Sequence, residues 1–331
     1  MNGDLQQISR YRGALMGIAI LLIVLFHIGL SRTDPFFGVK RMGNVGVDIF
    51  FLLSGIGLWY AWTKNPSAVH FYQRRLLRIF PAWLLVATAF YLPDYLGAQR
   101  FSSSIPDLIG DITINWDFWL HDELTFWYIP ATMALYVVAP CYMTCITRWP
   151  VFRWSPLLMI VMCVAIQYVR PLHDAIGHIE IFWSRVPIFL IGIGMGNLLK
   201  DNKRIDGATY TFLFLLLLTS LTTCIWMEQT LHGRFPLFIE RMLYIPLTVS
   251  FVILMARLLS SAPIRLTALL TWIGGISLEI YLLHCHFILV HIERWGWSYW
   301  PKALTCLALT LPAAWILHKL LEWLIRQTTK S

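Results

Sequence analysis

Charged side chains are scarce in this sequence of 331 residues: Asp, Glu, Lys and Arg together make up only 13% of it. Soluble globular domains usually carry about 25% charged and about 45–50% apolar residues. Here hydrophobic residues reach 58%. Apolar runs of about 20 residues, the length that crosses a bilayer as a helix, recur along the chain. The composition therefore excludes an ordinary soluble domain and predicts a multi-pass protein in a lipid bilayer.

The sequence also lacks the cysteine patterns of disulfide-rich and zinc-binding proteins. Its six cysteines lie in or beside apolar runs rather than in loops, and none forms a Cys-x-x-Cys pair. Such spacings are typical of structural zinc sites. We therefore expect neither a disulfide framework nor a metal site. Linkers, low-complexity tracts and internal repeats are missing as well, so residues 1–331 are predicted to form a single membrane-embedded domain.

Period-two alternation is absent too, and the apolar runs are too long for strands. We predict an all-α bundle of about ten membrane-spanning helices, because each span needs about 20 residues. The expected spans are 14–31, 43–63, 79–97, 124–145, 154–169, 180–199, 209–227, 236–258, 268–292 and 299–325.

Basic residues occur in short clusters between the apolar runs, although the net charge is +8. Lys and Arg concentrate in the cytoplasmic loops of membrane proteins. With both termini in the cytoplasm, clusters such as Lys200, Lys203 and Arg204 lie inside and the acidic segment 98–123 lies outside. We therefore predict a cytoplasmic N-terminus, a cytoplasmic C-terminus and no nucleic-acid partner.

A few ionisable side chains fall inside the predicted spans, where a functional role is the default hypothesis. His27 in "AILLIVLFHIGL" and Asp48 in "VGVDIFFLLSG" reach a similar depth on adjacent antiparallel helices, which allows a His–Asp pair. Further polar residues near this level or nearer mid-membrane predict a polar cavity inside the bundle. They are Arg185, Arg241, Glu279, His284 and His286.

Arginines cluster in the stretch "HFYQRRLLRIFPAW". Arg74, Arg75 and Arg78 are spaced so that a helix presents guanidinium groups on one face beside the membrane. Arginine clusters bind phosphate groups through their planar, multiply donating forks. A simple topology anchor is the alternative interpretation of this cluster.

The runs "RGALMGIAILLIVLFH", "GVDIFFLLSGIGLW" and "FYQRRLLRIFPAWLL" together resemble the opening of the membrane-bound acyltransferase-3 family. Its members acylate carbohydrates and other acceptors at bacterial envelopes. The later runs "FWYIPATMALYVVAP" and "WIGGISLEIYLLHCHFIL" resemble the family's central aromatic helix and its late histidine segment. The resemblance implies a bacterial inner-membrane enzyme, here expected without the extracytoplasmic serine-transferase domain that is fused to some members.

The resemblance also implies roles for individual residues. His27 falls on the family's catalytic histidine, while Arg75 and Arg78 fall on its Arg-x-x-Arg pair, which handles the acyl-CoA donor. The family usually carries an arginine eleven residues before the histidine, where this chain has Met16. Arg12, one helical turn earlier, is the expected substitute, and Arg74 is expected to join the donor site.

The implied reaction moves an acyl group, most commonly acetyl, from cytosolic acyl-CoA to a hydroxyl of an envelope carbohydrate or lipid-linked glycan. Acyl-CoA is the co-substrate, and no bound cofactor is expected. His27 acts as general base with Asp48 orienting its ring, although a covalent acyl-histidine route fits equally well. The expected acceptor and oxyanion residues are Ser54, Arg185, Arg241, Glu279, Tyr281 and His284.

Two other functions fit ionisable residues in the membrane. A transporter or flippase would also place such residues near the midplane and usually has an inverted repeat, which we do not find in this sequence. A receptor or assembly protein with a structural polar core would tolerate loss of His27.

Overall fold

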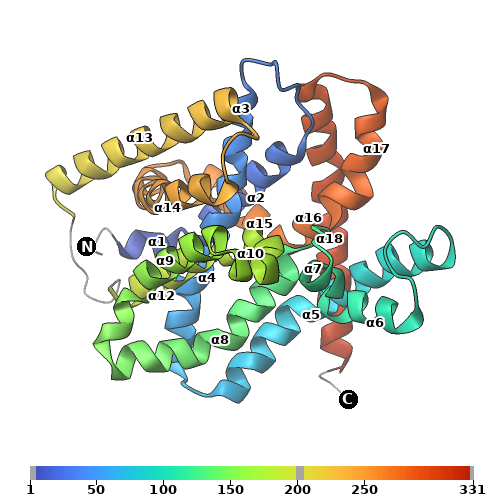
Figure 1. The fold of residues 1–331 in the computed structure, drawn as a ribbon, viewed down its shortest axis with the longest axis horizontal. Helices are drawn as coiled ribbons and strands as arrows, with labels where there is room; N and C mark the ends of the chain where they lie inside the picture. The colour runs from blue at the N-terminus through green and yellow to red at the C-terminus, as the bar shows by residue number, and fades with distance from the viewer. Residues whose placement is uncertain (1–4, 199–204, 329–331) are drawn as a thin grey trace.

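The computed structural model describes residues 5–198 and 205–328, and every regular element in these ranges is a helix (Figure 1). The predicted all-α class is confirmed. Lys200, Lys203 and Arg204, which contributed to the predicted orientation, lie outside the described residues.

The described residues form the following α-helices in chain order. They are α1 (Gln6–Arg10), α2 (Arg12–His27), α3 (Phe37–Arg41), α4 (Val45–Lys64), α5 (Ala68–Leu96), α6 (Ile105–Ile114), α7 (Trp116–Leu120), α8 (Tyr128–Arg148), α9 (Ser155–Tyr168), α10 (Arg170–Ile176), α11 (Glu180–Trp183), α12 (Val186–Leu198), α13 (Gly207–Leu231), α14 (Leu237–Ser260), α15 (Ile264–Gly275), α16 (Ser277–Leu283), α17 (Val290–Ile292) and α18 (Tyr299–Thr328).

Seven helical stretches of the described residues are long and apolar enough to cross a membrane, and two bent pairs raise this number to nine. The pairs are Arg170–Trp183 with Val186–Leu198, bent by 46°, and Ile264–Gly275 with Ser277–Trp295, bent by 58°. The first expected span corresponds to the shorter apolar helix α2. Each expected span thus has a helical counterpart, whereas the number ten and the sidedness of the termini stay predictions.

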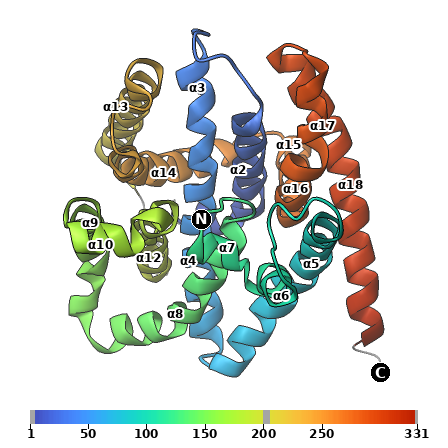
Figure 2. The same ribbon diagram turned by 45° about the vertical axis from the view of Figure 1, so that its right-hand side comes forward.

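Helices α2 and α4 occupy the centre of the bundle, with the other long helices around them (Figures 1 and 2). Helix α2 contacts α4 and α15, and α4 contacts α12 and α14. A Cβ atom on Gly17 of α2 would lie 2.0 Å from the Leu270 carbonyl oxygen of α15. Small residues let membrane helices approach closely and gain dispersion energy. The glycine therefore fixes α2 tightly against α15.

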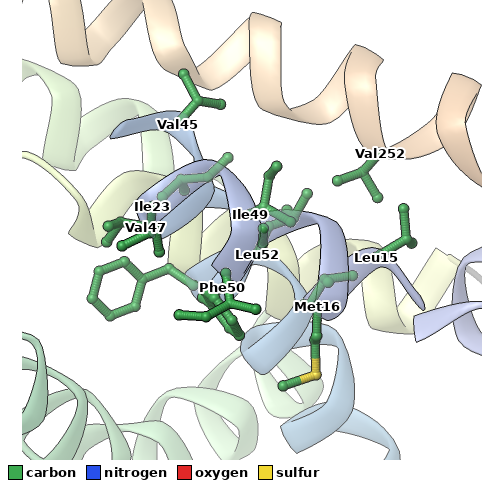
Figure 3. Close-up of a cluster of buried hydrophobic side chains, with 14 of the residues drawn as sticks. Leu15, Met16, Ile23, Val45, Val47, Ile49, Phe50, Leu52 and Val252 are labelled. Atoms are coloured by element: carbon green, nitrogen blue, oxygen red, sulfur yellow. The ribbon is translucent and has the colours of Figure 1, made fainter. Parts of the chain in front are cut away.

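Apolar side chains from α2, α4 and α14 fill the space on one side of the central pair. Figure 3 shows Val252 of α14 near Leu15 of α2 and Ile49 of α4, all of which are buried. Met16 and Phe50 point toward the other side of the pair (Figure 3). The two central helices thus separate this apolar packing region from the side toward which Met16 and Phe50 point.

Candidate active site

A narrow cavity of about 60 Å³ lies on the side of α2 and α4 toward which Met16 points. Side chains from α2, α4, α5, α8 and α16 line it. Four residues of the predicted site are among them, namely Arg12, Ser54, Arg78 and Tyr281. The structure therefore brings predicted donor residues and predicted oxyanion residues to one cavity.

One face of α2 runs along this cavity. Arg12, Met16, Ile20 and Ile23 line it at helical spacing, and His27 follows four residues later on the same face. At about 1.5 Å of rise per residue, Arg12 and His27 lie roughly 22 Å apart along the helix axis. The lining on α2 thus begins at the Arg12 guanidinium group and ends at Ile23, one helical turn before His27.

The Arg12 side chain is held at its end of the cavity by α4. Its Nε donates a hydrogen bond to the Leu53 carbonyl oxygen at 3.2 Å. Gly57 leaves the necessary room, because a Cβ atom there would lie 2.9 Å from Arg12 Nη2. Arg12 is also close enough to Arg75 and Arg78 for their charges to interact. The expected substitution of Arg12 for the arginine missing at Met16 is therefore geometrically possible.

The arginine cluster lies within α5, which begins eleven residues earlier than the predicted span at 79. Arg78 lines the cavity, and Arg75 lies over the rings of Phe71 and Tyr136, at 5.7 and 5.8 Å from their centres. Arg74 is exposed at the same end. Guanidinium groups therefore surround the cavity mouth, with Arg75 Nε buried and without a hydrogen-bond partner among the described residues.

At the other end, His27 contacts His284 from the second bent helix pair. His284 Nε2 lies 3.2 Å from His27 Nδ1, and the ring centres are 5.0 Å apart. His284 Nδ1 lies 2.9 Å from the carbonyl oxygens of Ile280 and Tyr281, and a ring nitrogen facing carbonyl oxygens must carry the proton. His284 Nε2 is consequently an acceptor.

The hydrogen-bond pattern fixes the proton position on His27 as well. Its Nδ1 faces His284 Nε2 and also the Ile23 carbonyl oxygen at 2.9 Å, and both are acceptors. The Nδ1 of His27 therefore carries the proton, and its Nε2 keeps a free lone pair. A neutral imidazole with a free Nε2 has the protonation state that a general base requires.

The segment that carries His284 has an unusual backbone. Gly274 and Gly275 precede the 58° bend at Ile276, and glycine pairs are a common cause of such kinks. Residues His284–Leu289 then form a π-helix, a geometry often found at functional sites. This distortion accompanies the placement of the buried His284 ring against α2.

Asp48 does not form the expected pair with His27. Its Oδ2 lies 3.5 Å from Arg185 Nε, and both side chains are almost completely buried. On α4 the cavity is lined by Val47, Phe50 and Ser54. Asp48 is rotated by about 100° from Val47, since an α-helix has 3.6 residues per turn. The predicted depths allowed a pair, but Gly46 packs on Ala19 of the antiparallel α2, so Asp48 lies more than two helical turns from the level of His27 and also faces another direction.

Arg185 and Arg241 belong to a separate polar cluster around Asp48. Arg185 lies at the break between α11 and α12, donates to Asn44 Oδ1 at 3.1 Å and lies over the Trp127 ring. Arg241 forms an ion pair with Glu180. The structure places both arginines with carboxylate partners, outside the cavity lining.

Two further predicted acceptor residues, Glu279 and Tyr281, lie in different parts of the structure: Tyr281 lines the cavity and Glu279 does not. Glu279 pairs with His318 of α18 at 2.7 Å and does not line the cavity. The Tyr281 hydroxyl accepts a hydrogen bond from the Tyr128 backbone N–H at 3.2 Å and thereby joins α16 to the start of α8.

Sequence reasoning missed the contribution of α8 to the cavity. Tyr128, Thr132 and Tyr136 line it from one face of the helix. Their spacing of four residues within "YIPATMALY" was the available signal, because it predicts a polar stripe on one helix face.

A carboxylate cluster in the segment 98–123 has the composition of a cation site. Oxygens of Asp107, Asp111 and Asp117 lie within 4.8 Å of one another. Asp111 accepts hydrogen bonds from the Ser102 hydroxyl and from the Asp117 backbone N–H, and burial raises the pKa of its carboxyl group. These hydrogen bonds join the Asp111 carboxylate to the surrounding segment.

A family model described as an acyltransferase domain matches residues 14–319. The chain belongs to the acyltransferase-3 family. It is therefore an acyltransferase and a multi-pass membrane protein, which confirms the predicted family and favours the enzyme over the transporter alternative.

Two curated proteins are similar to parts of the chain. Regulator of hypoxia-inducible factor 1 from Caenorhabditis elegans is 31% identical over 191 residues, covering 46% of this chain and 37% of the relative. Peptidoglycan O-acetyltransferase OatA from Listeria monocytogenes is 25% identical over 161 residues, covering 41% of this chain and 24% of the relative. The chain thus spans well under half the length of either relative. No solved structure matches it significantly.

Proposed function

We propose that this acyltransferase moves a short acyl group, most simply acetyl, from acyl-CoA to a hydroxyl of an envelope carbohydrate or lipid-linked glycan. The observation that carries the proposal is the cavity between the arginine cluster and His27, with both ends on one face of α2. The similar protein OatA is named a peptidoglycan O-acetyltransferase, which supports acetyl as the transferred group and an envelope polysaccharide as the acceptor class. We infer a bacterial inner-membrane location with both termini in the cytoplasm.

The donor binds at the arginine end. The phosphates of coenzyme A contact Arg75 and Arg78, with Arg12 and the exposed Arg74 adding positive charge. Planar guanidinium groups suit phosphate oxygens because they donate two parallel hydrogen bonds. The pantetheine arm then extends along α2 and brings the thioester toward His27. No bound cofactor is needed for this chemistry.

His27 performs the proton transfer. Its Nε2 takes the proton of the acceptor hydroxyl while the oxygen attacks the thioester carbon. The tetrahedral intermediate then expels the thiolate, which receives the proton from His27 and leaves as coenzyme A. His284, rather than Asp48, keeps the His27 ring in the required tautomer. General base catalysis of this kind contributes about 10²- to 10⁴-fold to the rate.

The oxyanion of the intermediate needs hydrogen-bond donors inside the membrane. Ser54 lies at the Arg12 end of the cavity, next to Leu53, and is therefore remote from His27. The Tyr281 hydroxyl belongs to the part of the cavity nearer His27, because the ring centres of Tyr281 and His284 are 6.1 Å apart. Donors that are already oriented act strongly where water is excluded. We assign the oxyanion site to the part of the cavity at Tyr281.

Release of free thiol from acetyl-CoA by the purified protein, with envelope glycan extracts as acceptors, tests the proposal. We expect acceptor-dependent release that falls by about 10²- to 10⁴-fold in His27→Ala. His291→Ala is the matched control, since His291 is exposed on α17 and contacts neither end of the cavity. Thiol release that is indifferent to His27 would refute the base assignment.

A further inference from the structure

A second and larger cavity, of about 830 Å³, opens on the other side of α2. Leu22 and Leu25 of α2 line it, and at 3.6 residues per turn they face roughly 145° away from the stripe that lines the donor cavity. The remaining walls come from the loop after His27, from α3 and from the start of α18. Figure 2 shows these segments together at one end of the bundle. We call this cavity the outer cleft.

The walls of the outer cleft are mainly apolar and aromatic. Phe36 is 68% exposed and Trp300 is 65% exposed, although both are large apolar side chains. Tyr299 anchors the wall to α2 because its hydroxyl donates to the Leu25 carbonyl oxygen at 2.9 Å. Aromatic side chains often mark the membrane–water interface. A cavity of this size beside them offers room for a hydrocarbon chain as well.

Lys40 supplies a positive charge to the outer cleft. Its Nζ lies 5.2 Å from the centre of the Phe26 ring, and among the described residues no carboxylate lies within ion-pair distance of it. Asp34 also lines the cleft, but its Oδ1 accepts a hydrogen bond from the Phe36 backbone N–H at 2.8 Å. An ammonium group beside apolar walls is complementary to an anionic amphiphile.

The second lysine of the cleft is already engaged. Lys302 forms an ion pair with Glu293, and the other carboxylate oxygen of Glu293 accepts the Gly29 backbone N–H at 2.7 Å. This chain of contacts ties the cleft wall to the loop two residues after His27. Lys302 therefore contributes positive potential, while Lys40 is the lysine free to contact a ligand directly.

We propose that the outer cleft binds a phosphate-bearing lipid, with the phosphate on Lys40 and the hydrocarbon along Leu22, Leu25 and Val39. The inference rests on the proposed function and specifies its acceptor as a sugar carried on such a lipid. Helix α2 ends at His27. A sugar attached to a lipid in the cleft therefore reaches the imidazole over the end of the helix, while the thioester arrives along the opposite face.

Native mass spectrometry of the full chain in detergent tests this site without any acyl donor. The probes are dioleoyl phosphatidic acid, dioleoylglycerol with the same chains and no phosphate, and inorganic phosphate. A hydrogen bond to a charged group contributes about 1.5–3 kcal/mol, so we expect phosphatidic acid to be retained at least about tenfold more strongly than dioleoylglycerol. Equal retention of the two lipids would overturn the proposal, as would displacement of phosphatidic acid by millimolar inorganic phosphate.

Variants of the lysine locate the binding. Lys40→Gln should abolish the preference for phosphatidic acid, and Lys40→Arg should keep it because the positive charge is retained. Lys64→Gln is the matched control, since Lys64 is an exposed lysine at the opposite end of α4. An unchanged preference in Lys40→Gln would contradict the assignment, and the folded charge states in the same spectra show that each variant is intact.

The two proposals fail separately. If lipid binding does not depend on Lys40 while thiol release depends on His27, the outer cleft is not the acceptor site and the enzymatic function stands. If Lys40 selects phosphatidic acid but no acyl donor yields thiol, the lipid site stands and its link to acyl transfer is lost.

Discussion

Two buried polar clusters lie on different faces of α4 and differ in how their polar groups are satisfied. Around Asp48 the carboxylate meets Arg185, and Arg241 meets Glu180. On the other side, hydroxyl-bearing side chains line the cavity, and the His27 Nδ1 beyond its end is paired with His284. The sequence predicts similar depths for His27 and Asp48, but Gly46 packs on Ala19, so Asp48 lies more than two helical turns from the level of His27. The distinguishing feature is the cavity, because the buried Asp48 oxygens also lack a hydrogen-bond partner among the described residues and meet the charge of Arg185.

The largest expected effect on stability follows removal of Asp48. Breaking a buried ion pair by deleting one partner usually costs about 3–5 kcal/mol, because the other charge stays buried. Asp48→Ala should therefore lower the midpoint of thermal unfolding in detergent far more than His27→Ala does. The double variant Asp48→Ala/Arg185→Leu should recover part of the loss, and a midpoint equal to that of the wild type in Asp48→Ala would contradict a structural role.

Substitutions at the arginine end of the cavity should mainly weaken binding of the acyl-CoA donor. Each charged hydrogen bond contributes about 1.5–3 kcal/mol, so the loss of two in Arg75→Gln/Arg78→Gln should raise the KM for acetyl-CoA by at least about 100-fold. Steady-state kinetics at saturating acceptor measure the change. Arg148→Gln, at an exposed arginine near the end of α8, serves as control and should leave KM unchanged. A fall in kcat without any change in KM would show that the pair does not bind the donor.

The smallest effect is expected at His284, which acts through His27. A neutral hydrogen bond contributes about 0.5–1.5 kcal/mol, so His284→Phe should lower kcat by about 2- to 10-fold with the KM for acetyl-CoA unchanged. His284→Gln should restore most of the rate, because its amide oxygen accepts from His27 Nδ1. Equal rates for the Phe and Gln variants would argue against a positioning role.

The sequence was sufficient to predict the helical class, and four of the predicted site residues, Arg12, Ser54, Arg78 and Tyr281, line one cavity. Apolar runs mark helices because every buried backbone group must be paired within the membrane. The family resemblance placed His27 and the arginines, and the spacing of Arg12, Met16 and His27 already places them on one helix face. Breaks such as the one at Ile276 were not predicted, since they depend on contacts between helices rather than on hydropathy.

Pairings between helices were the part that sequence could not supply. The sequence predicts similar depths for His27 and Asp48, but the register and rotation of α4 against α2 decide which side chain meets which partner. That rotation is set by the close packing of α4 against α12 and α14. The outer cleft could not be predicted from the sequence for the same reason, because its walls come from chain segments far apart in sequence.

The central claim is that His27 acts in catalysis whereas Asp48 acts in stability. It is tested most directly by thiol release per folded molecule for Asp48→Asn and His27→Ala, measured side by side with wild type. The structure predicts a rate close to wild type for Asp48→Asn wherever it remains folded, and a loss of about 10²- to 10⁴-fold for His27→Ala. Equal losses of thiol release in two fully folded variants would contradict this account and would indicate that Asp48 assists His27 in the reaction.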